Sequence, residues 1–348
     1  MNNQTSRPGQ LPDYITGAKP NPASNRAPWF KNTAPTYAGI FLWFVFWQDA
    51  VNAPFVGGSL AHGVGLALLA ILGAALVCHF LFYLVPGLLG QRTGLPLYIV
   101  GTSTFGATGG FIMPGFLMGV LQFGWLGVNV FFASLALSEF LGVNAQVIMV
   151  VWGVLAAFVG LKGIQYVAKV ATYLPLIPIV VLLLMLFKTV GGVGSFDPAT
   201  IQATHQEIAA GPTSTGTASP AMSAFALVAF IMTYIVGFFA TAGAAGVDFG
   251  TSSRDKNDVK MGGWIGVALA IFLTAGLSML IVAGVHGSSQ YQAKAKAAAQ
   301  ATVTATVGKA QAEANLAGKP LTDEEIEKIS ADTAPGALYQ SVQLIKVV

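Results

Sequence analysis

Seven long apolar runs dominate this sequence and restrict it to one class of fold. They lie near residues 36–60, 64–89, 105–138, 144–163, 168–188, 222–248 and 263–286. A helix needs about 20 predominantly apolar residues to cross the hydrocarbon core of a bilayer. Charged residues make up only 9% of the chain, against about 25% in a typical soluble domain. The sequence therefore predicts an all-α polytopic membrane protein with seven spans.

The segments outside these runs differ in composition. Residues 1–35 are rich in Pro, Asn, Ser and Gly, which predicts a disordered tail. Residues 189–221 form a polar loop, and residues 287–348 are rich in Ala, Lys, Gln and Glu, which predicts a polar helical arm. Lys and Arg gather on the side of the N-terminus, so we expect a cytoplasmic N-terminus, with the loop and the arm external. The expected location is the cell (inner) membrane.

Several classes of function find no support in the sequence. The lone cysteine, Cys78, allows neither an internal disulfide nor a thiolate metal cluster. The basic residues are scattered and the net charge is only +3, which argues against nucleic acid as a partner. There is no HExxH sequence, no Walker loop and no recognisable Ser/His/Asp set. We therefore expect no enzyme and no organic cofactor.

Two of the spans contain helix-breaking residues in corresponding positions. The first, LWFVFWQDAVNAPFVGGSL, carries Pro54 and the pair Gly57 and Gly58. The sixth, YIVGFFATAGAAGVDFG, carries Gly237, Gly243 and Gly246. Proline removes an amide donor and glycine lowers the cost of unwinding, so both spans are predicted to be broken. The alternative for the sixth span is that its glycines allow close helix packing.

The positions of the two spans suggest an inverted repeat. Each would open a unit of five helices, as in transporters that bind substrate at broken helices. Residues 36–188 would form the first unit (TM1–TM5) and residues 222–286 the start of the second (TM6–TM7). Because two such units need about ten helices, we expect a chain truncated after the seventh. Residues 334–348 would then lead to a missing TM8.

Asp49 is the most informative polar residue of the first span. A carboxylate within a membrane span is a functional candidate because it is costly to keep there. It could accept hydrogen bonds from a ligand, neutralise a coupling cation or carry a coupling proton. Alternatively, the open amides of the broken helix satisfy it.

A second polar cluster lies in the third span, within QFGWLGVNVFF. Trp125 and Asn129 are four residues apart, so they share one helix face, about 6 Å apart along the axis. An indole followed one turn later by an amide suits a flat ring with a polar edge. Helix packing, with Asn129 satisfied across an interface, is the alternative.

These residues resemble a known family. The element Trp125-Leu126-Gly127-Val128-Asn129 is similar to the W-[FL]-G-x-[QN] signature of the nucleobase:cation symporter-1 family, which comprises cytosine, purine, allantoin and hydantoin permeases. TGLPLYIVGTSTFGATGG resembles the segment that precedes it, with Thr102 where an arginine is common. FFATAGAAGVDFGTSSRD resembles the span-six block, with Phe239 in place of its Trp and Gly250 in place of its hydroxyl residue. The resemblance covers residues 36 to 286.

The resemblance implies a fold of the sodium-coupled, five-plus-five inverted-repeat type. It also implies a ring held between Trp125 and Phe239, with Asn129 at the ring edge. Asp49 and Gln48 would face the substrate, and Phe238 adjoins Phe239 as a further candidate. Carbonyls near Val45 and Gln48 would bind a cation. Separately, Asp248 and Arg254 are candidates for an inner gate.

The predicted function is symport of a nucleobase or related planar nitrogen heterocycle, coupled to Na⁺ or H⁺ by alternating access. The partners would be this small heterocycle and the lipid bilayer. The alternative is a non-transporting membrane sensor or receptor, or a truncated homologue, that binds a similar ligand. The sequence leaves open which heterocycle is bound, which cation is coupled and what the oligomeric state is.

Overall fold

A computed structural model of the chain describes residues 11–41, 50–53, 55–162, 164–173, 176–210, 222–345 and 347–348. The described residues contain helices and no β-strand, apart from one isolated bridge between Ala27 and Ser253. The chain divides into two compact units, each assembled from three separate segments. Unit 1 contains Met1–Ile40, Ala75–Leu174 and Val236–Leu269, and unit 2 contains Phe41–Ala74, Pro175–Ile235 and Ala270–Val348.

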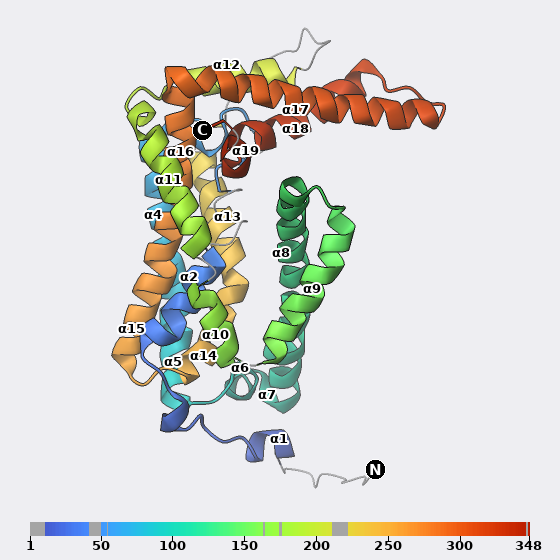
Figure 1. The fold of residues 1–348 in the computed structure, drawn as a ribbon. Coiled ribbons are helices and arrows are strands. Elements are labelled where there is room, and N and C mark those ends of the chain that lie inside the picture. Colours follow the sequence, from blue (N-terminus) through green and yellow to red (C-terminus); the bar gives the residue numbers. More distant parts are fainter. Residues whose placement is uncertain are drawn as a thin grey trace. The chain divides into compact units, whose positions relative to one another are not determined.

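Unit 1 is built around the helices of the second, third and fourth apolar runs. Its elements are α1 (Asp13–Thr16), η1 (Ala23–Asn25), η2 (Trp29–Lys31), α2 (Thr33–Phe41), η4 (Cys78–Leu84), α5 (Val85–Thr93), α6 (Leu97–Val100), α7 (Thr102–Gly110), η5 (Phe111–Leu117), α8 (Met118–Leu141), α9 (Ala145–Leu161), α10 (Ile164–Tyr173), α14 (Gly246–Thr251), α15 (Lys256–Gly263) and η6 (Trp264–Leu269). Helices α8 and α9 form a hairpin (Figure 1). Gly142 ends α8 with φ +67°, and the Asn144 side chain caps α9 by accepting the Gln146 N–H at 2.8 Å.

The N-terminal segment differs from the expected disordered tail. From residue 11 onward it packs on unit 1, and the Tyr14 hydroxyl donates to the Ala107 carbonyl. The Asn21 N–H donates to the Gly94 carbonyl at 2.8 Å, and the Trp29 N–H donates to the Asp258 carboxylate at 3.1 Å. The prolines that suggested disorder also pre-set extended backbone, which here reaches across the ends of other helices. The expectation of disorder therefore fails for residues 11–35.

Unit 2 contains the segments predicted as a polar loop and a polar arm, and Pro198–Ala209 of the predicted loop form a helix instead. Its elements are η3 (Gly58–Leu60), α4 (Val64–Val77), α11 (Leu176–Val193), α12 (Pro198–Ala209), α13 (Ala224–Ala244), α16 (Ala270–Gly287), α17 (Ser289–Leu316), α18 (Asp323–Tyr339) and α19 (Ser341–Ile345). Helices α2, α4 and α13 contain boundaries between the units. The predicted arm is helical: α17 and α18 form a long hairpin, and α12 lies beside it (Figure 1). Thr322 and Glu325 cap α18 reciprocally.

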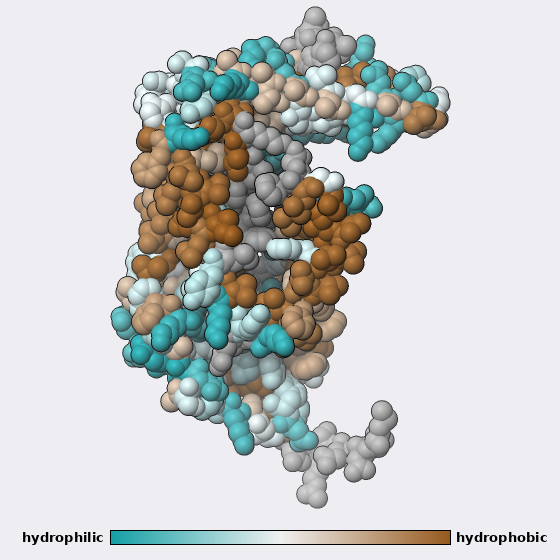
Figure 2. Space-filling model, in the orientation of Figure 1, coloured by the Kyte–Doolittle hydropathy of each residue, from teal (hydrophilic) through white to brown (hydrophobic). Residues whose placement is uncertain are grey.

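Helix length and surface composition agree with a multi-pass membrane protein. Among the described residues, four stretches are long and apolar enough to cross a bilayer, and two shorter apolar helices accompany them: Val64–Thr93, Thr102–Leu135, Leu176–Val193 and Lys256–Gly287, then Ala145–Leu161 and Ala224–Ala240. Large apolar side chains are exposed on the α8–α9 hairpin, as Figure 2 shows. Phe123 is 74% exposed, Val150 68% and Leu161 85%. An apolar surface of this extent suits lipid.

The predicted break in the first span is confirmed for its described residues. We call residues 50–53 and 55–60 the first-span break. They contain no α-helix, and Gly57 and Gly58 have φ +86° and +57°. Local hydrogen bonds replace the helical ones: the Ser59 hydroxyl donates to the Ala50 carbonyl at 2.8 Å, and the Gly58 N–H to the Phe55 carbonyl at 2.9 Å. Backbone at membrane depth must be satisfied in this way.

The predicted break within the sixth span is wrong at Gly237 and is limited to one turn at Ala245, between Gly243 and Gly246. Helix α13 runs without interruption from Ala224 to Ala244, and only the turn at Ala245 separates it from α14. The glycines serve packing instead. A Cβ at Gly243 would lie 2.8 Å from the Phe82 Cβ atom, and one at Gly250 would lie 2.1 Å from the Gly87 carbonyl oxygen. Because glycine costs a helix interior only about 1 kcal/mol, close packing can outweigh its tendency to unwind.

The third span begins with a bent entry in its Gly/Pro-rich stretch. Gly106 has φ +71° and ψ 174°, so the helix kinks inside α7. A π-helical stretch, η5, follows and contains Pro114. From Met118 onward α8 is a regular helix, and it positions the aromatic and amide cluster of the third span.

Candidate functional site

Helix α8 presents Trp125 and Asn129 on one face, as the spacing predicts. Both side chains are half-buried. One Asn129 Nδ2–H donates to the Trp125 carbonyl oxygen at 2.8 Å, within the same helix. This bond fixes the amide next to the indole but uses only one of its two N–H donors.

Among the described residues, Phe238 is an aromatic neighbour of Trp125. The two ring centroids lie 4.6 Å apart at 72°, an edge-to-face contact between α8 and the end of α13. A flat ligand stacked between two rings would need about 3.5 Å on each side, so the centroids would have to separate to about 7 Å. The pair is therefore closed in this structure, and a ligand would bind by parting it or by stacking on one of its rings.

Phe239, the predicted sandwich partner, points elsewhere. It is fully buried and packs on Tyr37 of α2, with the ring centroids 5.8 Å apart. Tyr37 in turn contacts Tyr83 at 5.2 Å and Phe249 at 4.6 Å. Adjacent residues on a helix point about 100° apart, so Phe238 and Phe239 cannot both face α8. The placement of Phe239 opposite Trp125 is corrected to Phe238.

The predicted site residues of the first span, Asp49, Gln48 and Val45, lie outside the described residues. The described residue nearest to them with a notable polar atom is Asn52, in unit 2. Its Oδ1 atom is buried without a hydrogen-bond partner in the described part of the chain. Within the same part, no three His, Cys, Asp or Glu side chains are grouped as a metal site. The Asn52 oxygen is therefore a further candidate ligand in the first-span break.

The two candidate gate residues take different partners. One Asp248 carboxylate oxygen accepts the Leu97 N–H at 2.9 Å. Arg254 instead forms a bidentate pair with Asp258, with N–O distances of 2.8 and 3.3 Å. Asp258 also accepts the Trp29 N–H. The structure thus links Arg254 to the N-terminal segment through Asp258, and it does not join Arg254 to Asp248.

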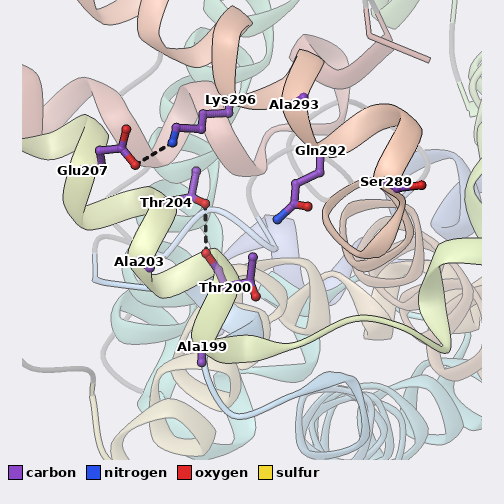
Figure 3. Close-up of a pocket in the computed structure, with 9 residues that line it drawn as sticks. All are labelled: Ala199, Thr200, Ala203, Thr204, Glu207, Ser289, Gln292, Ala293 and Lys296. Carbon is purple, nitrogen blue, oxygen red and sulfur yellow. Dashed lines mark hydrogen bonds and ion pairs between the residues drawn. The ribbon is translucent and has the colours of Figure 1, made fainter.

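A cavity of about 710 Å³ lies in unit 2 (Figure 3). It is a groove between α12 and α17, and the ion pair of Lys296 and Glu207, at 2.6 Å, lines it. Thr200 and Thr204 also line it, but the Thr204 hydroxyl is bonded within α12. The groove shares no residue with the predicted heterocycle site.

Some residues of this chain's polar framework were missed by sequence reasoning. His205 and Tyr339 lie 134 residues apart and are both buried, and the His205 Nδ1 atom lies 2.6 Å from the Tyr339 hydroxyl. Asp258 was missed as well, although Asp255 three residues before it is recognisable as a helix cap. No local pattern could pair His205 with Tyr339, because their contact depends on how α12 and α18 pack.

Comparison with known proteins gives a consistent result. Residues 21–306 match the family model described as permease for cytosine/purines, uracil, thiamine, allantoin. The structure matches that of Mhp1, a nucleobase-cation-symport-1 family transporter solved in a closed conformation with bromovinylhydantoin bound. The TM-score is 0.52 at 14% identity, over 93% of this chain and 65% of the Mhp1 chain. At this identity the match supports the fold alone. The comparison with curated proteins gave no match.

Proposed function

Because this chain belongs to the family of permeases for cytosine/purines, uracil, thiamine and allantoin, we propose that it transports a planar nitrogen heterocycle. The proposed process is symport with Na⁺ or H⁺ by alternating access. The chain spans 65% of the length of the Mhp1 chain, and the activity of a whole transporter is a proposal for it.

The observation that carries the proposal is the cluster on α8. Trp125 and Phe238 offer two aromatic faces, and Asn129 places a polar amide one turn away. Base–aromatic stacking is worth about 1–3 kcal/mol per ring, and an amide can read the hydrogen-bonding edge of a heterocycle. In this proposal the substrate stacks on Trp125 after Phe238 moves aside, and Phe239 supports Phe238 from behind through its contact with Tyr37.

The first span supplies the remaining polar groups of the proposal. Asp49 and Gln48 would meet the substrate, and carbonyls near Val45 and Gln48 would bind the coupling cation. The buried Asn52 oxygen supports this assignment, because an unpartnered carbonyl oxygen in a broken helix suits a hard cation or a ring N–H. Asp248 and Arg254 stay candidates for the inner gate.

The proposed topology has the N-terminus in the cytoplasm and the protein in the cell (inner) membrane. Residues 36–188 would be the first five-helix repeat and residues 222–286 the start of the second. The distribution of Lys and Arg supports this orientation. A cysteine introduced at Gln292 on α17, in a Cys78→Ser background, should react with an impermeant maleimide added outside the cells.

Uptake by proteoliposomes tests the function directly. Full-length protein is reconstituted, and accumulation of labelled cytosine, uracil, allantoin and hydantoin is measured with an imposed Na⁺ or H⁺ gradient. One of these heterocycles should accumulate, and Trp125→Ala should abolish its uptake.

Trp152→Ala on α9 is the matched control, because Trp152 is also a half-buried indole of unit 1. Its uptake should stay close to that of the unchanged protein. Equal uptake by the Trp125→Ala protein would remove the site assignment, and uptake of none of the four heterocycles would contradict the proposed substrate class.

A further inference from the structure

The strongest unassigned arrangement in the molecule joins the C-terminal end of α18 to the first-span break. The Gly57 N–H donates to the Tyr339 hydroxyl oxygen at 3.1 Å. The Tyr339 ring also packs directly on Gly58, where a Cβ atom would lie 2.9 Å from it. Tyr339 is fully buried, and all these residues belong to unit 2. A side chain from the arm therefore satisfies an amide that unwinding of the first span leaves open.

His205 on α12 completes a chain of hydrogen bonds. Its Nδ1 atom lies 2.6 Å from the Tyr339 hydroxyl oxygen, and only 4% of the residue is exposed. Since the Gly57 N–H already donates to that oxygen, the hydroxyl proton is available to the histidine. The consistent arrangement is Gly57 N–H to Tyr339 O–H to His205 Nδ1, which requires a neutral imidazole with Nδ1 unprotonated.

The same face of α12 contacts the chain just after the break. The Gln202 side-chain amide donates to the Ala61 carbonyl at 2.8 Å, and Gln202 lies one helical turn before His205. On the other side, the His286 Nε2 atom at the end of α16 lies 3.0 Å from the Leu338 carbonyl oxygen. The hydrogen bonds of Gln202 and His286 thus fix the segments on either side of Tyr339.

We propose that Tyr339 is a positioning residue for the first-span break. Protonation of His205 breaks its hydrogen bond with Tyr339, and Tyr339 then no longer fixes the break. This inference deepens the proposed function and rests on it for its role in transport. The contact of Gly57, Tyr339 and His205, which we call the latch, keeps the break in one geometry. Release lets the break change shape, and in such transporters the substrate and ion sites are formed by broken helices of this kind.

Protonation opposes the latch for a geometric reason. A proton on Nδ1 turns His205 from an acceptor into a donor, so the Tyr339 oxygen would face two donors and its own proton would lose its partner. Burial also disfavours the imidazolium ion and lowers the pKa of His205 from its ordinary 6.5 to about 4. The latch therefore contributes its full stability above about pH 6.5 and loses it as the pH falls toward 4.

The charged and titratable groups near His205 do not stabilise its protonated form. On α12 the nearest is Glu207, which is paired with Lys296 of α17. On α18 the nearest in sequence is Asp332, about 10 Å along the helix axis from Tyr339. On α16 His286 is bonded to the Leu338 carbonyl, and His62, which follows the break, is exposed and lies 2.5 Å from the Met222 carbonyl oxygen. Among these described groups, no carboxylate is bonded to the His205 ring.

Hydrogen exchange at the break tests the latch without any substrate. Full-length protein in lipid nanodiscs is labelled at pH 7.5 and pH 5.0, and exchange of peptides covering residues 55–63 is corrected for the intrinsic rate. With pKa values of about 4 latched and 6.5 released, protection should fall roughly 30-fold between the two pH values. Peptides from α4 (Val64–Val77) report whether the fold itself is intact.

Three variants separate a latch from a general packing role. Tyr339→Phe keeps the ring on Gly58 and should lower protection of residues 55–63 at pH 7.5, with little further change at pH 5.0. His205→Gln removes the titrating group and should give protection that is equal at both pH values. His62→Gln is the matched control, and its protection should fall with pH as in the unchanged protein.

Two results would overturn the proposal. One is protection of residues 55–63 in the unchanged protein that does not depend on pH. The other is a His205→Gln protein that retains the full 30-fold fall, which would assign the titration elsewhere. Both results are independent of heterocycle binding, so a working latch without heterocycle uptake would refute the proposed function while leaving the positioning of the break intact.

Discussion

The first-span break and the segment from Gly237 to Gly246 are two glycine-rich regions that the sequence treats alike but the fold treats differently. At Gly57 and Gly58 the glycines supply positive φ angles that other residues rarely adopt. In α13 and α14, Gly243 and Gly246 supply space for Phe82 and Pro86 while the backbone stays helical or turns once at Ala245. Glycine therefore marks a special requirement without saying whether that requirement is conformational or steric.

The two regions also differ in what happens to their backbone amides. In the break, Ser59, Tyr339 and local turns supply hydrogen bonds in place of helical ones. The first span also contains Pro54, and proline has no backbone N–H to donate to a helical hydrogen bond. The sixth span has no proline between Ala224 and Ala244, and its helix persists. A broken span needs a breaker and also partners for the amides that it frees.

The largest effect is expected at Gly58, where both requirements meet. Gly58→Ala places a Cβ at φ +57°, 2.7 Å from the Val51 carbonyl oxygen and 2.9 Å from the Tyr339 ring. Left-handed strain and overpacking together should lower the free energy of unfolding by about 3 kcal/mol. Denaturant unfolding in micelles measures this loss. Gly65→Ala on α4 is the control, because its Cβ would meet nothing within 4 Å. Equal stability of the two variants would show that the break does not have this geometry.

A smaller effect is expected where glycine serves packing alone. Gly250→Ala would place a Cβ 2.1 Å from the Gly87 carbonyl oxygen, so α14 must move away from α5. Overpacking of this kind costs about 2 kcal/mol, without any contribution from backbone strain. The same unfolding assay measures it, with Gly160→Ala on α9, whose Cβ lies in open space, as the control. A Gly250→Ala protein as stable as its control would mean that these helices are not in close contact.

The smallest effect has the opposite sign. Gly237 lies inside continuous helix, and a Cβ there would meet nothing within 4 Å. Gly237→Ala should therefore raise the free energy of unfolding by about 0.5–1 kcal/mol, because alanine loses less backbone entropy in a helix. A loss of stability on this substitution would restore the predicted break in the sixth span and remove the contrast between the two regions.

Sequence reasoning succeeded where chemistry is local. Pro54 with Gly57 and Gly58 predicted the first break, and the four-residue spacing of Trp125 and Asn129 predicted their shared face. It failed where helix rotation or packing decides. Phe238, and not its neighbour Phe239, contacts Trp125, because a one-residue change turns the side chain by about 100°.

Contacts between residues far apart in the sequence could not be predicted for a related reason. The contact of His205 with Tyr339 depends on the packing of α12 and α18, which carry no shared pattern. The structure of the N-terminal segment also could not be predicted from its composition. Its Pro- and Asn-rich composition fits both a disordered tail and the extended, hydrogen-bonded segment that residues 11–35 form.

Equilibrium binding tests the central claim, a planar heterocycle stacked on Trp125, most directly. Labelled cytosine, uracil, allantoin and hydantoin are titrated onto purified full-length protein, Trp125→Phe, Trp125→Ala and Trp152→Ala. We predict that one heterocycle binds, that Trp125→Phe weakens it modestly, and that Trp125→Ala weakens it by about 10- to 100-fold, as expected for loss of one stacking ring. Trp152→Ala should bind as the unchanged protein does. Binding that is equally tight in the Trp125→Ala protein would contradict the account.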